Sequence, residues 1–288
     1  MTALSTHDTK RDEDVRARLL AAADDLESWE AVWRLVAAAA KGHHVDAPTA
    51  YLLMQTLVGA WPITPDRLAG YLPKAVREAK QYTTWSDPDP AYEQRVLDLG
   101  AACLNGDVAD FIERWVTQLT PAERSRNLSA KLLQLTMPGL PDVYQGCEGV
   151  QRSLVDPDSR RDVDFEGLRA RLIRLDADQR PTDLMDEKLR LTSRVLRLRR
   201  DRPELFAVES TYLPLPSTSP RVLGFVRSEA VATVVSRGIV PASADSTFSL
   251  PAGSWRDLLS DRVVRGATVS CGEALAERGV ALFVREDG

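Results

Sequence analysis

The chain has 288 residues, of which 44% are hydrophobic and 27% are charged, and this balance is typical of a packed globular protein. The formal net charge of -5 disfavours a nucleic-acid backbone or an anionic membrane surface as a partner. No apolar run reaches the roughly 20 residues of a membrane helix, and three widely spaced cysteines favour a reducing compartment, so we expect a cytoplasmic protein.

Apolar residues at helical spacing predict that residues 13–134 are almost wholly helical. The first two helices are predicted in EDVRARLLAAADDL and in SWEAVWRLVAAAA, where Ser28 is expected to be the N-cap. TAYLLMQTLVGAW predicts a third, buried helix, and in the fourth, PDRLAGYLPKAVREAK, we expect Pro73 to bend or break the helix. Further on, Thr120 and Pro121 predict a new helix start, because TPAE has the spacing of a capping box.

The pattern changes after residue 134. TMPGLPDVYQG predicts a short buried strand that runs into a loop, and SLVDPDSRRDVDF predicts a charged loop. Two amphipathic helices are then predicted in FEGLRARLIRL and EKLRLTSRVLRLRR. The residues of the second that are expected to face inward are Leu189, Val195, Leu196 and Leu198. From about residue 206, period-two segments predict a small antiparallel β domain, namely TYLPLP, RVLGFVRS, AVATVVSRG, STFSLPAG, SWRDLLSD and VALFVRE.

The N-terminal string ALSTHDTKRDEDVR contains the first candidate site, His7 and Asp8. A carboxylate beside an imidazole, near the end of a strand, can bind sugar hydroxyls through charge-assisted hydrogen bonds. Lys10 and Arg11 would add donors and favour the ionised form of the carboxylate. The alternative is a solvated terminal tail in which Thr9 only caps the next helix.

The second candidate site is the loop PGLPDVYQGCEG, in which Tyr144, Gln145 and Glu148 follow a path set by prolines and glycines. Such loops often present polar groups over a cleft, and the alternative is a tight structural turn with a buried tyrosine. The acidic residues of LVDPDSRRDVDF are expected mainly to brace their own loop.

No metal or other cofactor is expected, because the string HHVD is not accompanied by a further set of ligands. Most of the tryptophans have helical spacing and are expected in the core. Trp61 and Trp85 lie in predicted loops, and they are therefore the better candidates for contact with a ligand.

Six strings occur in an order and at a spacing that resemble the maltooligosyltrehalose synthases of the α-amylase superfamily. They are LSTHDTKRDEDVRARL, LLMQTLVGAWP, KAVREAKQYTTW, MPGLPDVYQGCE, LVDPDSRRDVDF and LRLRRDRPELF. The resemblance implies the C-terminal part of a (β/α)8 barrel with a large helical insertion, followed by a small antiparallel β domain. The implied parts are the end of barrel strand 7 (1–12), the insertion (13–130), strand 8 with the closing helices (131–205) and the β domain (206–288).

The resemblance also implies an activity, that of a (1→4)-α-D-glucan 1-α-D-glucosylmutase. This isomerase turns the reducing-end α-1,4 link of a maltooligosaccharide into the α,α-1,1 link of trehalose by intramolecular transglycosylation. Asp8 matches the third carboxylate of the superfamily, which stabilises the transition state, and His7 would donate to a hydroxyl of the same ring. Residues that match positions around the reducing-end subsites are Lys10, Arg11, Tyr144, Gln145 and Glu148.

An ordinary barrel alone needs about 250 residues, and only its last two strands can be placed here. The chain therefore resembles a C-terminal fragment that lacks the nucleophile and the acid/base residue, and we expect it to be inactive alone. Its expected partners are a maltooligosaccharide substrate and the missing N-terminal half of the barrel, with neither nucleic acid nor membrane. Two alternatives stay open: a non-catalytic helical and β module that binds glucan or another subunit, or another enzyme of the α-amylase family.

Overall fold

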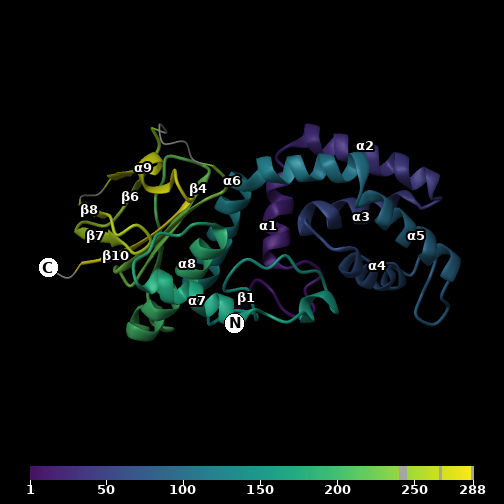
Figure 1. Ribbon diagram of the computed structural model, residues 1–288. Coiled ribbons are helices and arrows are strands. Elements are labelled where there is room, and N and C mark those ends of the chain that lie inside the picture. The colour runs from purple at the N-terminus through teal and green to yellow at the C-terminus, as the bar shows by residue number, and fades with distance from the viewer. Residues whose placement is uncertain (240–244, 266–267, 287–288) are drawn as a thin grey trace. The chain divides into compact units, whose positions relative to one another are not determined.

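The computed structural model describes residues 1–239, 245–265 and 268–286, and the chain divides into two compact units (Figure 1). One unit is largely helical and consists of Thr6–Thr120 and Gln151–Asp162. The other contains the β-sheet and consists of Met1–Ser5, Pro121–Val150 and Val163–Gly288. Every helix in the described part of the chain is too short or too polar to cross a membrane.

The helical unit is organised around one buried helix. Its elements are α1 (Glu13–Ala22), α2 (Leu26–Gly42), α3 (Ala47–Ala60), α4 (Pro65–Ala79), α5 (Pro90–Cys103), the first part of α6 (Gly106–Thr136) and the short 3-10 turn η1 (Asp158–Arg160). Helix α3 packs against α1 and α2, and it buries Leu53, Met54 and Leu57 completely. Helix α4 packs against α5. The predicted helical character of residues 13–134 is therefore confirmed.

Side-chain caps set the beginnings of these helices. Asp25, Asp46, Thr64 and Asp89 each accept a hydrogen bond from a backbone N–H in the first turn of α2, α3, α4 and α5. Such caps satisfy donors that the helix itself leaves unpaired. The prediction that Ser28 is the N-cap of the second helix was wrong, because its N–H donates to the Asp25 carboxylate three residues earlier.

Two prolines lie inside helices rather than ending them. Helix α4 continues through Pro73, and α6 runs from Gly106 to Thr136 through Pro121, so the predicted helix start at Thr120 was wrong. The Thr120 hydroxyl donates to the Val116 carbonyl within the helix, at 3.4 Å, instead of capping a new one. Packing along a helix can offset the backbone hydrogen bond that a proline removes.

The other unit contains a six-stranded sheet in the order β3-β4-β5-β10-β7-β8, with every neighbouring pair antiparallel. Its strands are β3 (Tyr212–Pro214), β4 (Val222–Arg227), β5 (Val231–Ser236), β7 (Ser254–Asp257), β8 (Val263–Arg265) and β10 (Val280–Arg285). Strands β6 (Thr247–Ser249) and β9 (Thr268–Ser270) form a second, two-stranded sheet beside the short helix α9 (Cys271–Leu275). Each predicted strand segment contains one strand, whereas β8, β9 and α9 were not predicted.

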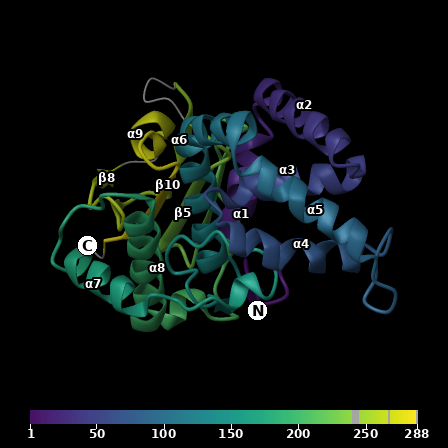
Figure 2. The ribbon, with the colours of Figure 1, turned by 45° about the vertical axis from the view of Figure 1, so that its right-hand side comes forward.

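Both faces of the six-stranded sheet are covered. Ala232 and Val234 of β5 belong to a core with β6, β9 and α9, whereas Val231 and Val235 belong to a core with α6 and α8 (Leu184–Asp201). Alternate side chains of a strand point to opposite faces, so a strand covered on both sides has no polar face. Figure 2 shows α8 and the central strands from a second direction.

Two further elements belong to this unit. Helix α7 (Phe165–Asp176) packs on α8, and the 3-10 turn η2 (Pro203–Phe206) follows α8. On α8, Leu189 and Val195 are buried and Leu198 is partly buried, as predicted. Leu196 is exposed, so its predicted inward position was wrong. The predicted apolar side of α8 is therefore only partly covered by neighbouring elements.

A short parallel pair joins the start of the chain to the loop after α6. Strand β1 (Thr2–Ala3) pairs with β2 (Pro141–Asp142), and Thr2 lies opposite Pro141. The buried side chain of Gln134 donates to the carbonyl oxygens of Thr2, at 3.4 Å, and of Asp142, at 2.6 Å. A strand is therefore present in TMPGLPDVYQG, although it has only two residues. The prediction that it is buried was wrong, because Pro141 is half-buried and Asp142 is exposed.

Two glycines in helices provide a matched test of packing in the helical unit. A Cβ atom at Gly59 of α3 would lie 2.7 Å from Cγ1 of the buried Val15, whereas Gly70 of α4 is exposed with nothing within 4 Å. We expect Gly59→Ala to lower the free energy of unfolding by about 1–3 kcal/mol through overpacking. Gly70→Ala should raise it by about 0.5–1 kcal/mol, because alanine is the better helix former. Urea unfolding followed by circular dichroism measures both, and two variants of equal stability would contradict this packing.

Candidate functional site

His7 and Asp8 lie in a tight turn at the beginning of the helical unit. The Thr6 N–H donates to Oγ1 of Thr9 at 2.8 Å, and the Thr9 N–H donates to the Thr6 carbonyl at 3.2 Å. Nε2 of His7 lies 3.3 Å from Oδ2 of Asp8, and the two side chains are 57% and 82% exposed. The imidazole and the carboxylate therefore contact each other, and both are accessible to a ligand. Thr9 closes this turn and does not cap α1, whose N-cap is Asp12.

The segment that carries this turn is attached to residues 151–162 of the same unit. Arg11 forms an antiparallel bridge with Leu154, and the Asp12 N–H donates to the Ser153 carbonyl at 3.0 Å. The Ser159 hydroxyl donates to the His7 carbonyl at 3.3 Å. These contacts order the backbone of the segment, while the side chains of His7 and Asp8 stay mostly exposed to solvent.

A buried carboxylate holds the 151–162 segment in place. Asp158 is 3% exposed and receives two hydrogen bonds from Arg67 of α4, at 2.8 and 2.9 Å. It also accepts the Leu154 N–H at 2.8 Å and forms an ion pair with Arg161 at 3.0 Å. Burial alone would raise the pKa of Asp158, but the bonds from Arg67 and Leu154 outweigh it and hold the pKa below its ordinary value. The charged loop is thus mainly a brace, as expected.

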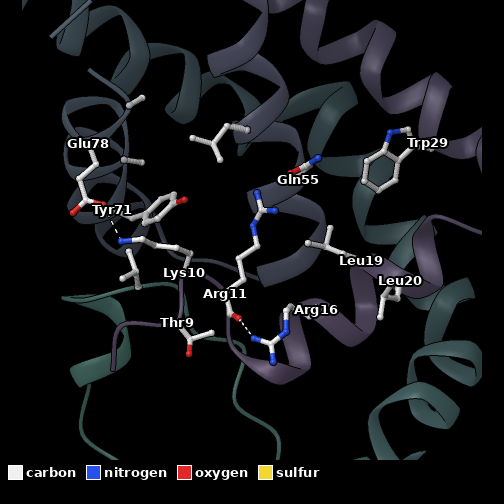
Figure 3. Close-up of a pocket in the computed structure, with 14 residues that line it drawn as sticks. Thr9, Lys10, Arg11, Arg16, Leu19, Leu20, Trp29, Gln55, Tyr71 and Glu78 are labelled. Carbon is white, nitrogen blue, oxygen red and sulfur yellow. Dashed lines mark hydrogen bonds and ion pairs between the residues drawn. The ribbon is translucent and has the colours of Figure 1, made fainter. Parts of the chain in front are cut away.

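A cavity of about 870 Å³ opens beside this turn, within the helical unit (Figure 3). It is bounded by the segment around Arg11 and by α1, α2, α3 and α4. The residues that line it are Thr9, Lys10, Arg11, Arg16, Leu19, Leu20, Trp29, Leu52, Gln55, Tyr71, Ala75, Glu78, Ala79 and Val155. Most of these present carbon atoms, with a few charged and polar groups among them, which is the composition of a small-molecule site.

The side chain of Arg11 lines this cavity with a charged group. Figure 3 shows its guanidinium directed towards Gln55, beside Tyr71. Its Nη2 atom is buried and has no hydrogen-bond partner among the described residues. Burial lowers the pKa of Arg11, and Tyr71 partly opposes this effect. A buried donor without a partner is costly, so an oxygen atom of a ligand would be favoured here.

Lys10 occupies a different side of the cavity. Its Nζ atom lies 2.9 Å from Oε2 of Glu78, near the end of α4 (Figure 3). On the same helix Lys74 lies 3.6 Å from Asp156. The cavity wall thus combines an apolar surface with donors and acceptors, and this combination suits the C–H faces and hydroxyls of a sugar.

Tyr144, Gln145 and Glu148 belong to the other unit, in the loop that follows β2. Gln145 is exposed, whereas Tyr144 and Glu148 are half-buried. Oε2 of Glu148 is buried without a hydrogen-bond partner in the described part of the chain. Of the predicted site residues, the structure therefore groups His7, Asp8, Lys10 and Arg11 in the helical unit, and their proposed roles stay predictions.

The two loop tryptophans have different environments. Trp61 is 8% exposed and donates from Nε1 to Glu113 at 3.0 Å, so it is a core residue and the prediction of ligand contact does not fit it. Trp85 is 58% exposed. In HHVD, Asp46 is the N-cap of α3 and accepts a hydrogen bond from Tyr92. The described residues contain no cluster of three side chains that could hold a metal ion.

Sequence reasoning missed Arg67, which braces the site, and it missed Gln55, Tyr71 and Glu78, which line the cavity. Each lies in a helix whose pattern explains it as an ordinary helical residue. The only available signal was indirect, since a loop as acidic as LVDPDSRRDVDF needs cationic partners from elsewhere.

Comparison with known proteins gives one consistent result. No family model matches the chain. A Mycobacterium tuberculosis protein that is named as a maltooligosyl trehalose synthase is 37% identical over 301 residues, which cover 100% of this chain and 38% of that protein. The solved structure of maltooligosyltrehalose synthase from Arthrobacter ramosus is 40% identical over 99% of this chain and 38% of that one, with a TM-score of 0.88. A structure from Sulfolobus tokodaii, named a hypothetical maltooligosyl trehalose synthase, is 27% identical with a TM-score of 0.78.

These similarities extend over 98–100% of this chain. The chain is therefore a homologue of the maltooligosyltrehalose synthases and corresponds to a C-terminal portion of them. It spans about 38% of the length of the curated relatives that it matches.

The ion pair of Asp158 generates a stability prediction. Asp158→Asn keeps the shape of the side chain but leaves the largely buried Arg67 without its counter-charge, and should lower the free energy of unfolding by about 3–5 kcal/mol. Asp162→Asn, at an exposed position of the same loop, is the control and should change it by about 0.5 kcal/mol or less.

The effect of Asp158→Asn should also depend on pH. The folded-state pKa lies below the ordinary 3.8, so the stabilisation is fully present above pH 3.8 and is lost as the pH falls through the folded value. The difference between wild type and variant should therefore narrow below pH 3.8, as measured by urea unfolding. A difference that stays constant down to about pH 2 would contradict this assignment.

Proposed function

We propose that this chain is the part of a maltooligosyltrehalose synthase that supplies a transition-state-binding carboxylate, Asp8, together with cationic side chains around it. The observation that carries the proposal is the similarity of the entire chain, at 37% and 40% identity, to one stretch of such enzymes. The accessible pair of His7 and Asp8 beside a large, partly polar cavity supports it.

We further propose that β1 and β2 are neighbouring strands of a (β/α)8 barrel. Their parallel pairing supports this, because strands of such barrels are parallel neighbours and active sites lie at their carboxyl ends. The segments that begin at Leu4 and Val143 accordingly leave the strand pair at the same edge. In this proposal residues 13–130 are an insertion, 131–205 hold strand 8 and the closing helices, and 206–288 are the C-terminal β domain.

The proposed reaction is a double displacement at the anomeric carbon of the penultimate glucose unit. A nucleophilic carboxylate forms a bond to this carbon while the α-1,4 link breaks, and an acid protonates the departing O4. The released glucose then attacks with its own anomeric hydroxyl, the same acid/base residue takes that proton, and the carboxylate leaves. Confinement of the released glucose lets it compete with water. We place the nucleophile and the acid/base residue in the part of the relatives that this chain does not cover.

Asp8 would act on the sugar ring that carries the developing positive charge. Its carboxylate would accept hydrogen bonds from ring hydroxyls, and these bonds strengthen in the oxocarbenium-like transition state. His7, 3.3 Å from this carboxylate, would donate to a hydroxyl of the same ring. Lys10 and Arg11, with the neighbouring cavity, would hold the reducing-end glucose.

A chimera tests this proposal. The corresponding portion of the Mycobacterium tuberculosis relative is replaced by these 288 residues, and conversion of maltohexaose is followed by the loss of reducing ends and by product analysis. We expect trehalosyl product from the chimera and none from the 288-residue chain alone. Asp8→Asn in the chimera should lower kcat several hundred-fold, about what the loss of one transition-state contact costs.

The control is Asp110→Asn, which changes an exposed carboxylate of α6 and should leave kcat unchanged. Circular dichroism and melting curves show whether each chimera is folded. Full activity in the Asp8→Asn chimera would refute the role of Asp8. Trehalosyl product from the isolated chain would refute the proposal that the nucleophile and the acid/base residue lie outside this chain.

A further inference from the structure

The loop of residues 80–89, between α4 and α5, presents two aromatic side chains to solvent. Tyr82 is 54% exposed and Trp85 is 58% exposed. Figures 1 and 2 show this loop extending beyond the ends of α4 and α5, within the helical unit. Two exposed aromatic rings this close together in the chain are uncommon on a surface that binds no ligand or partner.

Each ring is supported by a side chain of the helices. The Arg77 guanidinium carbon lies 4.9 Å from the centre of the Trp85 ring. The Tyr82 ring lies on the Tyr92 ring with their centres 4.9 Å apart and their planes inclined by 34°. Since one side of each ring meets a protein side chain and more than half of each residue is exposed, the other side is accessible to a ligand.

The supporting side chains are themselves fixed. Arg77 donates two hydrogen bonds to Glu93, at 2.8 and 2.7 Å, and these bonds lower the pKa of the Glu93 carboxyl. The buried Thr83 hydroxyl donates to the same carboxylate at 2.6 Å. The Tyr92 hydroxyl donates to Asp46, the N-cap of α3, at 2.6 Å. The rings therefore rest on a hydrogen-bonded base.

The tip of the loop is closed by its own hydrogen bonds. The Thr84 N–H donates to the Asp87 carbonyl at 3.0 Å, and the Asp87 N–H donates to Oγ1 of Thr84 at 2.8 Å. The Asp89 N–H donates to Oγ1 of Thr83 at 3.0 Å. Because the backbone is already ordered, a ligand that stacks on the rings pays little conformational entropy.

We propose that residues 80–89 form a glucan-binding site, in which Trp85 and Tyr82 stack against glucose units of an α-1,4-linked chain. The face of a pyranose ring that carries C–H groups is apolar and matches the flat face of an indole or phenol. The exposed Ser86 and Asp87, which follow Trp85 in the chain, offer partners for sugar hydroxyls. The exposure and the support of the two rings are observed independently of the proposed function. The choice of an α-glucan as the ligand rests on the proposed function.

The charge of this loop argues against a nucleic acid as the stacked ligand. The loop contains two acidic residues, Asp87 and Asp89, and one basic residue, Lys80, and the chain carries a net charge of -5. Nucleic-acid sites that stack bases on aromatic rings combine them with a positively charged groove. A neutral ligand rich in hydroxyls is the better match.

The 288-residue chain itself is the material for the test, which does not need catalysis. Maltohexaose is titrated into it, with calorimetry for the affinity and the indole N–H resonances in 15N spectra for the position. We expect saturable binding that shifts the Trp85 resonance. Trp85→Ala and Tyr82→Ala should each weaken binding about tenfold, whereas Trp85→Phe, which keeps a flat ring, should weaken it by only about threefold.

Phe165→Ala is the matched control, because it removes a comparably exposed aromatic ring from the other unit and should leave the affinity unchanged. Melting curves confirm that each variant is folded. No saturable binding by the folded wild-type chain up to about 20 mM maltohexaose would overturn the proposal. Maltohexaose binding that is unaffected by Trp85→Ala would overturn it as well. Such a result is expected if this surface contacts a protein instead of a glucan.

Failure of this inference can be distinguished from failure of the proposed function. Asp8→Asn should leave the shift of the Trp85 resonance by maltohexaose unchanged, although it removes the activity of the chimera. An active chimera that keeps full activity and full affinity after Trp85→Ala would leave the proposed function intact and overturn only the glucan site.

Discussion

The buried carboxylate of Asp158 is the contact on which the geometry of the candidate site depends. It connects Arg67 at the start of α4 to the Leu154 N–H, and Leu154 is bridged to Arg11. A chain of short contacts thus runs from a helix to the guanidinium that reaches into the cavity. Because charged groups in such a position are stable only when they are paired and hydrogen-bonded, the segment has one favourable arrangement.

Helix α4 connects three features that are far apart in the sequence. Its first turn carries Arg67, the partner of Asp158. Near its last turn, Glu78 pairs with Lys10 at the cavity, and the Arg77 guanidinium lies against the face of the Trp85 ring. The residue that braces the loop, the one at the cavity and the one that supports the aromatic ring therefore all lie on the same helix, α4. Sites built on helices hold their geometry better than sites on loops alone.

The other unit is organised by burial of a sheet on both faces. Val231 and Ala232 of β5 point into different cores, one shared with α6 and α8 and the other with β6, β9 and α9. Gln134 of the same α6 also holds β1 beside β2 through two carbonyl oxygens. The helix that covers the sheet thereby also fixes the short parallel pair.

Much of the local structure follows directly from residue patterns. The helices over residues 13–134, the six strand segments after residue 206 and the polar cluster at His7 and Asp8 were all predicted from spacing and residue type. The ordered strings that resemble maltooligosyltrehalose synthases agree with the homology found over the whole chain. The failures concern single positions, such as Pro121, which lies inside α6 instead of beginning a helix.

The sequence by itself determined which stretches are helical or extended and which side of each is apolar, because periodicity and caps are local properties. Only the tertiary structure decided that Asp158 pairs with Arg67, 91 positions away, that Trp61 is buried, and that Trp85 is exposed on a supported loop. The physical reason is that a periodic pattern shows that a face must be covered but not which distant element covers it. Pairing, burial and the shape of a cavity are set by those long-range contacts.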